Sequence, residues 1–182
     1  DGATVTAFTA ADGLLHDNVS SIVEDRLGRM WLGTWGEPDH CGLTCFDGTF
    51  FDSFGSEDGL PEGGVSCLAV DRRGCLWCGT LRDGVCRCDV SDRTATGMVV
   101  TAFGVAQGLP GPAVLSVAED DAGDIWFGTP EGPCRFDGRD LASYTSRDGL
   151  PADGVGHMAA DRRGGLWLAT RAGLCRCERQ AA

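Results

Sequence analysis

The chain has 182 residues, of which 42% are hydrophobic and 23% charged, and this balance is typical of a folded domain and excludes a disordered tail. Its formal net charge is −12, from 15 basic and 27 acidic residues. We expect no nucleic-acid partner, because a phosphate backbone is bound by clustered Lys and Arg side chains. No apolar run reaches the roughly 20 residues of a membrane-spanning helix, so we expect no membrane span in this chain.

One short motif occurs four times along the sequence. Each copy reads Asp-x-x-Gly-x-apolar-Trp, and the copies end at Trp31, Trp77, Trp126 and Trp167. A repeat with a period of roughly 40–50 residues predicts one structural unit per copy.

Residues 4–8 come before the first repeat and predict a single β-strand. Each repeat then predicts four short strands, which we call a, b, c and d in chain order. Strand a leads into the aspartate, and the Asp-x-x-Gly that follows predicts a tight turn, because Asp bonds to the backbone downstream and Gly adopts a positive φ. Strand b carries the tryptophan and ends at Gly-Thr or Ala-Thr. The four copies of strand a cover residues 19–24, 65–70, 114–119 and 155–160, and those of strand c cover 42–46, 84–88, 132–136 and 173–177.

Strand d ends on an aromatic residue in every copy, at Phe8, Phe54, Phe103 and Tyr144. The first of these strands stands alone at the N-terminus, and the last strand c has no strand d after it. The sequence therefore predicts an all-β fold, a β-propeller of four-stranded antiparallel blades with four blades per chain, as one domain over residues 1–182. Its blades would span residues 14–54, 60–103, 109–144 and 150–178.

The N-terminal strand is expected to pair with the C-terminal blade and remove its exposed edge. The pairing could close a four-bladed ring within one chain, or join two chains as an eight-bladed homodimer. A third possibility is that the chain is a piece of a larger propeller.

The second repeat and its sisters carry a family resemblance. The pattern Val-x-x-Ile-x-Glu-Asp-Arg-x-Gly-x-Leu-Trp-Leu-Gly-Thr, followed by Gly-Leu-x-x-Phe-Asp-Gly, resembles the two-component regulator propeller repeat. The resemblance implies a bacterial sensor-type propeller with a sensing or binding role, and a periplasmic or extracytoplasmic location. It supplies no catalytic residues, because the motif is structural. The fourth repeat departs from it at Ala169, where its sisters have Gly, and at Glu178, where they have Asp.

The four tryptophans are expected to fill the spaces between neighbouring blades, since a buried aromatic removes about 150–250 Å² from water. Ten cysteines are present, and most occupy strand positions where sister repeats carry Leu, Phe, Ser, Thr or Arg. We expect most of them to be free, buried thiols. Disulfides between Cys78 and Cys86, or between Cys41 and Cys45, are the alternative.

The link between strands b and c is longer in the first repeat than in the others and carries Trp35, Asp39 and His40. This link and its shorter sisters are expected to form one rim of the propeller, where a ligand such as a glycan could bind. A tolerated surface insertion is the alternative. His157 is expected to line the inner channel. The candidate ligand-binding residues are Trp35, Asp39, His40, Arg82, Glu131, Arg171 and His157.

No catalytic motif is recognisable, and we predict no cofactor. No metal site is predicted either, because adjacent loop residues cannot readily surround one ion. The function expected is a non-enzymatic ligand-binding or protein-interaction module of a bacterial signalling protein. The alternatives are a propeller fragment that self-assembles into a ring as a homodimer, and a hydrolase or lyase that uses channel residues such as His157.

Overall fold

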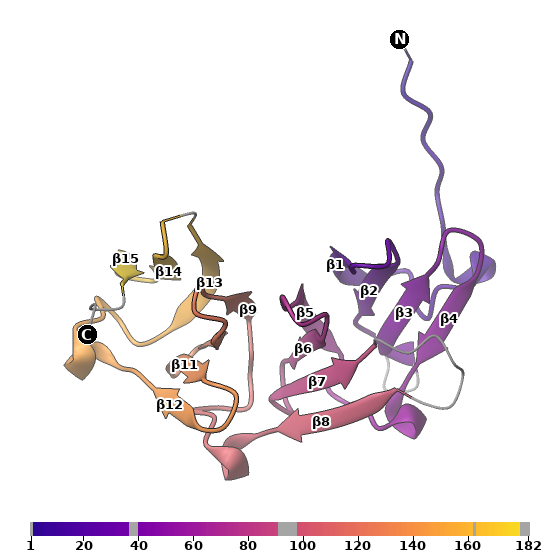
Figure 1. Ribbon diagram of the computed structural model, residues 1–182. Coiled ribbons are helices and arrows are strands. Elements are labelled where there is room, and N and C mark those ends of the chain that lie inside the picture. The colour runs from indigo at the N-terminus through magenta and orange to yellow at the C-terminus, as the bar shows by residue number, and fades with distance from the viewer. Residues whose placement is uncertain (1, 37–39, 91–97, 162, 179–182) are drawn as a thin grey trace.

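The computed structural model describes residues 2–36, 40–90, 98–161 and 163–178. Four antiparallel sheets follow one another along an open arc, as predicted for the blades of a propeller (Figure 1). Three sheets have four strands and the last has three, and within each sheet the strands lie in chain order. The strands of the four blades are β1 (Val19–Glu24), β2 (Met30–Thr34), β3 (Gly42–Phe46) and β4 (Phe51–Phe54); β5 (Val65–Val70), β6 (Leu76–Thr80), β7 (Val85–Asp89) and β8 (Val99–Phe103); β9 (Ser116–Glu119), β10 (Ile125–Thr129), β11 (Gly132–Phe136) and β12 (Leu141–Ser143); β13 (Val155–Ala160), β14 (Leu166–Thr170) and β15 (Gly173–Cys177).

The expected strands agree closely with the observed ones. Strand a of the third blade begins at Ser116 rather than Val114, and its strand d ends at Ser143, one residue before the aromatic Tyr144. Short 3₁₀ turns, which the sequence pattern did not predict, follow each strand d position. They are η1 (Ala10–Asp12), η3 (Ser56–Asp58), η4 (Val105–Gln107) and η5 (Ser146–Asp148).

The Asp-x-x-Gly turn of each repeat is held by its aspartate. In the second blade, Asp71 Oδ1 accepts hydrogen bonds from the backbone N–H groups of Arg73 and Cys75, both at 2.9 Å. Its Oδ2 accepts one from the indole N–H of Trp77 at 2.9 Å. Gly74 closes the turn with a φ of +86°, which an L side chain rarely adopts. The indole bond recurs in the other three blades at 2.9–3.0 Å, so one carboxylate fixes both the turn and the tryptophan.

The core consists of three apolar clusters, one at each junction between neighbouring blades. Trp31 packs against the second blade, Trp77 against the third and Trp126 against the fourth, and their exposed fractions are 2%, 2% and 7%. Trp167 of the last blade is 37% exposed, so the expectation that all four tryptophans lie between blades holds for three of them.

The N-terminal segment does not complete the last blade of its own chain. Residues 2–9 form no strand, Val5 is 89% exposed, and the segment extends away from the blades at the end of the arc opposite β15 (Figure 1). The ring closed within one chain is therefore wrong for this structure, because the four blades leave the two ends of the arc apart. Among the described residues, no helix is long and apolar enough to cross a membrane.

Candidate functional site

Two edges of the arc carry candidate sites. We call the edge formed by the b–c links and the loops that enter each blade the loop rim, and the edge formed by the Asp-x-x-Gly turns the turn rim. Backbone hydrogen bonds tie the loop rim together across blades, as the sequence led us to expect. The N–H of Gly84 donates to the carbonyl of Pro112 at 2.8 Å, and the N–H of Val114 donates to the carbonyl of Thr80 at 2.7 Å.

On the loop rim, the enlarged link of the first blade is anchored on both sides. The side chain of Trp35 is 50% exposed, yet its ring lies so close to Gly64 that a Cβ there would be 2.5 Å from Trp35 Cδ1. The imidazole of His16 lies equally close to Gly36, at 2.9 Å from an ideal Cβ. At the far end of the link, the Cys41 thiol donates to the carbonyl of Glu62 at 3.2 Å. Trp35 is thus an exposed aromatic surface fixed on the backbone of two blades.

The sequence did not single out His16, which belongs to the loop that enters the first blade. The only feature of the sequence that pointed to His16 was its place three residues after Gly13. The propeller pattern puts this loop beside the enlarged link.

The other loop-rim candidates are exposed but separate from one another. Arg82 lies beside Gly63, and the Glu131 carboxylate covers Gly111. Arg171 and His40 are also exposed. No hydrogen bond or ion pair joins these side chains to each other or to Trp35 within the described part of the chain. Asp39 lies outside the described residues.

His157 lies on β13, opposite Ala169 of β14, and is exposed. Strands β1, β5, β9 and β13 lie next to one another along the inner side of the arc, which is where the sequence placed strand a. His157 is therefore on an inner strand, at the end of the arc that no further blade covers in this structure.

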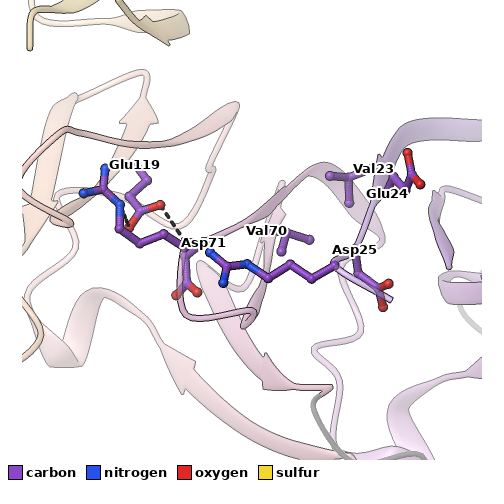
Figure 2. Close-up of a pocket in the computed structure, with 8 residues that line it drawn as sticks. Val23, Glu24, Asp25, Val70, Asp71 and Glu119 are labelled. Carbon is purple, nitrogen blue, oxygen red and sulfur yellow. Dashed lines mark hydrogen bonds and ion pairs between the residues drawn. The ribbon is translucent and has the colours of Figure 1, made fainter. Parts of the chain in front are cut away.

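On the turn rim, a shallow hollow of about 400 Å³ spans the first three blades (Figure 2). Its walls come from the ends of the inner strands and the turns that follow them. The lining residues are Val23, Glu24, Asp25, Arg26, Val70, Asp71, Arg72 and Glu119.

Arg72 closes one end of this hollow by joining the second blade to the third. Its Nε lies 3.0 Å from Glu119 Oε1, and its backbone N–H donates to Glu119 Oε2 at 2.7 Å. Its two terminal nitrogens donate to the carbonyls of Asp121 and Asp120 at 2.7 and 2.5 Å. Every end of the guanidinium is used, so Arg72 is a structural clamp between blades.

Arg26 occupies the same position in the first blade, but the residue equivalent to Glu119 in the second blade is Val70. The Arg26 side chain makes no hydrogen bond or ion pair with any described residue. The sequence signal for the clamp is an arginine directly after the turn aspartate of one blade and a glutamate directly before the turn aspartate of the next blade. Between the first two blades the arginine is present but the glutamate is missing.

Burial and hydrogen bonding act in opposite directions on the turn carboxylates. Burial opposes the ionisation of Asp25, but hydrogen bonds from the Trp31 indole and from Arg29 outweigh it and lower the pKa of Asp25. The backbone N–H of Gly165 and the indole of Trp167 lower the pKa of Asp161. Both of these carboxylates are therefore held in the charged form at neutral pH.

Three of the repeats match a known family. Residues 13–36, 59–82 and 108–131 match the two component regulator propeller family. These three segments are similar to the two component regulator propeller repeat. The matches cover the entry loop, strand a, the Asp-x-x-Gly turn and strand b, and these elements form both rims. The fourth blade lies outside the matched segments.

Solved structures with the same fold include two from B. thetaiotaomicron. One is the extracellular domain of BT3049, described as a hybrid two component system, with a TM-score of 0.79, 22% identity, and coverage of 96% of this chain and 23% of that one. The other is the extracellular domain of BT4673, also described as a hybrid two component system, with a TM-score of 0.75, 23% identity, and coverage of 97% and 24%. This chain therefore spans about a quarter of the length of those two domains.

A virginiamycin B lyase from Staphylococcus aureus shares the fold more distantly. Its TM-score is 0.62 at 18% identity, over 89% of this chain and 56% of the lyase. At such identities the similarity concerns the fold alone. No curated protein matches this sequence significantly.

Proposed function

We propose that this propeller segment is a non-enzymatic binding module of a bacterial signalling protein, and that it takes its ligand on the loop rim around Trp35. The observation that carries the proposal is the half-exposed indole held against Gly64 at the entry to the second blade. An aromatic ring that is already fixed loses little conformational freedom when a flat group stacks on it.

The ligand class that fits this surface is a glycan. The apolar face of a sugar ring can stack on Trp35. The exposed Arg82 lies beside Gly63 in the entry loop of the second blade, where it could offer a polar group to the ligand. The two component regulator propeller repeats and the two extracellular domains from B. thetaiotaomicron support a role in sensing.

The experiment is a binding screen with neutral and acidic oligosaccharides, read by thermal shift and calorimetry. We expect at least one oligosaccharide to bind, and Trp35→Ala to weaken that binding at least tenfold with the unfolding midpoint unchanged. Phe50→Ala is the matched control, because Phe50 is also an exposed aromatic, at 69%, but lies in the turn between β3 and β4. Binding that Trp35→Ala leaves intact would place the ligand elsewhere and overturn the proposal.

A second candidate function is self-assembly into a ring, and a specific observation favours it. In the first three blades the aromatic at the end of strand d lies on the tryptophan of its own blade, at ring-centroid distances of 5.3–5.9 Å. The last blade has no such strand, and its Trp167 is 37% exposed.

The N-terminal segment has the sequence that this vacancy requires. Residues 5–8 read Val-Thr-Ala-Phe, and so do residues 100–103 of β8, the strand d of the second blade. The 3₁₀ turns that follow are also alike, since η1 and η4 both end in a glycine with a φ between +110° and +120°, at +117° and +112°. We propose that residues 4–8 of a second copy supply the missing strand, and the mass in solution tests it.

A further inference from the structure

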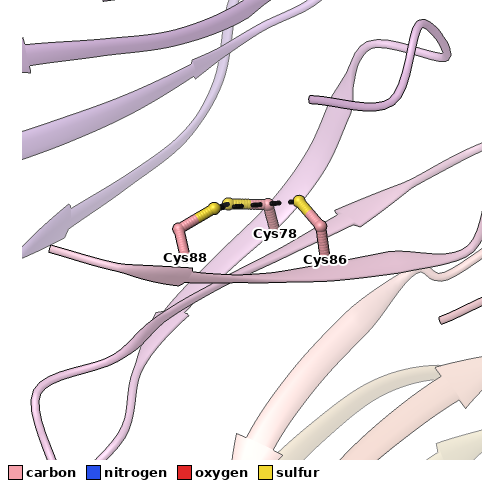
Figure 3. A group of neighbouring side chains, drawn as sticks. All are labelled: Cys78, Cys86 and Cys88. Carbon is pink, nitrogen blue, oxygen red and sulfur yellow. Dashed lines mark hydrogen bonds between the residues drawn. The ribbon is translucent and has the colours of Figure 1, made fainter. Parts of the chain in front are cut away.

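Three cysteine side chains meet inside the second blade (Figure 3). Cys78 lies on β6, and Cys86 and Cys88 lie on β7. All three are fully buried. The Sγ atoms of Cys78 and Cys88 are 3.9 Å apart, as are those of Cys86 and Cys88, and all three sulfurs lie within 4.8 Å of one another.

The register of the sheet produces this meeting. Cys78 is the direct partner of Cys86 across the β6–β7 pair. Cys86 and Cys88 are two residues apart, so their side chains leave the sheet on the same face. That face packs into the core between the first two blades. The sequence identified the pair on strand c and the cross-strand position of Cys78, but treated the first as core packing and the second as a candidate disulfide.

All three cysteines are free thiols in the structure, and their spacing is that of ligands around one metal ion. A metal–sulfur bond of about 2.3 Å puts three sulfurs in a trigonal plane about 4.0 Å apart. The separations of Cys88 Sγ from the other two sulfurs, both 3.9 Å, agree with this value. A disulfide would need about 2.05 Å and a rearrangement of the strands.

We propose that Cys78, Cys86 and Cys88 bind one Cu(I) ion in a three-sulfur site. Thiolate sulfur is the donor that selects soft ions such as Cu(I) and Zn(II). The three sulfurs belong to an apolar cluster that includes Leu43, Val65 and Leu76, and among the described residues no His, Asp, Glu or further Cys joins the group. A structural Zn(II) site takes four ligands, whereas three sulfurs satisfy Cu(I), so the surroundings favour Cu(I).

Protons compete with the metal at this site, because each thiol must release its proton as its sulfur–metal bond forms. Burial raises the pKa of the Cys78 thiol well above its usual range. Hydrogen bonds from the Cys78 and Cys88 thiols lower the pKa of Cys86.

The fourth blade provides a natural comparison. It repeats the pair on strand c as Cys175 and Cys177, but carries Leu168 where the second blade has Cys78. Leu168 is fully buried beside this pair, so a leucine fits at this position next to two cysteines. Cys78→Leu therefore removes one ligand and reproduces a combination that the fold already accommodates.

The test uses the reduced full chain, refolded without oxygen in the presence of Cu(I) and bathocuproine disulfonate as a competing chelator. Refolding is needed because the closed core gives the ion no path to the sulfurs. We expect the wild-type chain to retain one Cu(I) more than Cys78→Leu does. We also expect X-ray absorption to give three sulfur neighbours at about 2.3 Å. The double variant Cys175→Ala/Cys177→Ala should retain the ion as the wild type does.

Equal copper retention by the wild type and Cys78→Leu would overturn the proposal. So would a site with two sulfur neighbours in the wild type, or retention of Zn(II) with four ligands in place of Cu(I). The X-ray absorption measurement needs no variant, so it decides the question even if Cys78→Leu folds poorly. The result is independent of ligand binding at Trp35.

Discussion

At the scale of single residues, the turn aspartate both holds the Asp-x-x-Gly turn and orients the tryptophan of strand b. The repeat predicted a tight turn at the aspartate and a buried tryptophan on strand b. The indole bond from Trp77 to Asp71 joins the two, so the turn fixes the orientation of the core side chain. The bond could have been inferred from the constant spacing of the two residues, but only once the a–b hairpin was known to bring them together.

Asp71→Ala should destabilise the protein strongly. The substitution leaves the buried Trp77 indole and the backbone N–H groups of Arg73 and Cys75 without their acceptor. Loss of hydrogen bonds to a charged group costs about 1.5–3 kcal/mol. Urea unfolding followed by circular dichroism would measure the change. Asp161→Ala is the control. Asp161 accepts the same turn and indole bonds in the exposed fourth blade, plus one from Arg176 Nε at 2.9 Å, and because these bonds are less buried, its loss should still cost clearly less. An equal loss in both variants would contradict this account of burial.

Stability should also fall in acid, because the turn carboxylates are held in the charged form. The pKa values of Asp25 and Asp161 are lowered in the folded state, so the unfolded chain binds protons first as the pH drops. The stabilisation is fully present above the unfolded value near pH 4 and is lost as the pH falls through the lower folded values. We expect the unfolding midpoint to be constant above about pH 5 and to fall below about pH 4. A flat profile down to about pH 2 would contradict the prediction, and Asp161→Asn should make the acid slope shallower.

The positions of the three core thiols show where residue-level prediction stopped. Cys78 and Cys88 align with Leu or Phe of sister blades, whereas Cys86 aligns with Thr44 of the first blade and with cysteines of the last two. The sequence did not predict that the three sulfurs come close together, because their separation depends on the local twist of the sheet and on the side-chain rotamers. The loop rim shows the same limit. The pattern placed Trp35 at the rim, while its contact with Gly64 depends on how the second blade docks.

At the scale of elements, the glycine at the end of strand b belongs to the blade junction. The repeat predicts Gly-Thr at the end of strand b, and the fourth repeat departs from it at Ala169. In the structure, Gly79 faces Val114 of the next blade, and a Cβ there would lie 2.4 Å from Cys67 Sγ and 2.9 Å from Val114 Cγ1. Gly33 meets Val65 in the same way at the first junction. Glycine is therefore needed wherever another blade docks.

Gly79→Ala should accordingly destabilise the junction between the second and third blades. The added methyl group must displace Cys67 and Val114, and overpacking of a filled core costs about 1–3 kcal/mol. Chemical unfolding monitored by tryptophan fluorescence would show the loss. The matched control is Ala169→Gly, the reverse exchange at the equivalent position of the fourth blade, where Ala169 is exposed. If the control lowers stability as much as Gly79→Ala does, crowding between blades is not the reason for the glycine.

At the scale of the whole molecule, the repeat predicted the blades, their order and their strand register, but closure lies beyond what one repeat can specify. Each junction follows from local complementarity, and the number of blades in a ring depends on the angle accumulated over all of them. In this chain the two ends of the arc stay apart (Figure 1), and each leaves an apolar feature uncovered: Phe8 at one end and Trp167 at the other, with exposed fractions of 48% and 37%.

If a second copy supplies strand d of the last blade, Phe8 must exchange its present neighbours for Trp167. Phe8 now lies 5.5 Å from Phe46 and 5.4 Å from Phe51, as ring-centroid distances within its own chain. In the dimer it would take the position that Phe103 has on Trp77, at 5.9 Å. Analytical ultracentrifugation should then give twice the chain mass of 19.1 kDa. Phe8→Ala should weaken the dimer at least tenfold, because a central aromatic anchor carries much of the energy of an interface.

Phe50→Ala is the control for this substitution, since it removes an exposed aromatic that has no place in the proposed pairing. The ring hypothesis also predicts a contact at the loop rim. Ala169 would lie against Val19 of the second copy, as Gly79 lies against Val114 within the chain. The extra methyl group makes this junction wider than the three inside the chain, so the dimer should be weaker than an internal junction and should dissociate on dilution before the blades unfold. A mass of one chain at every concentration, or a dimer that Phe8→Ala leaves unchanged, would show that residues 4–8 do not pair in trans.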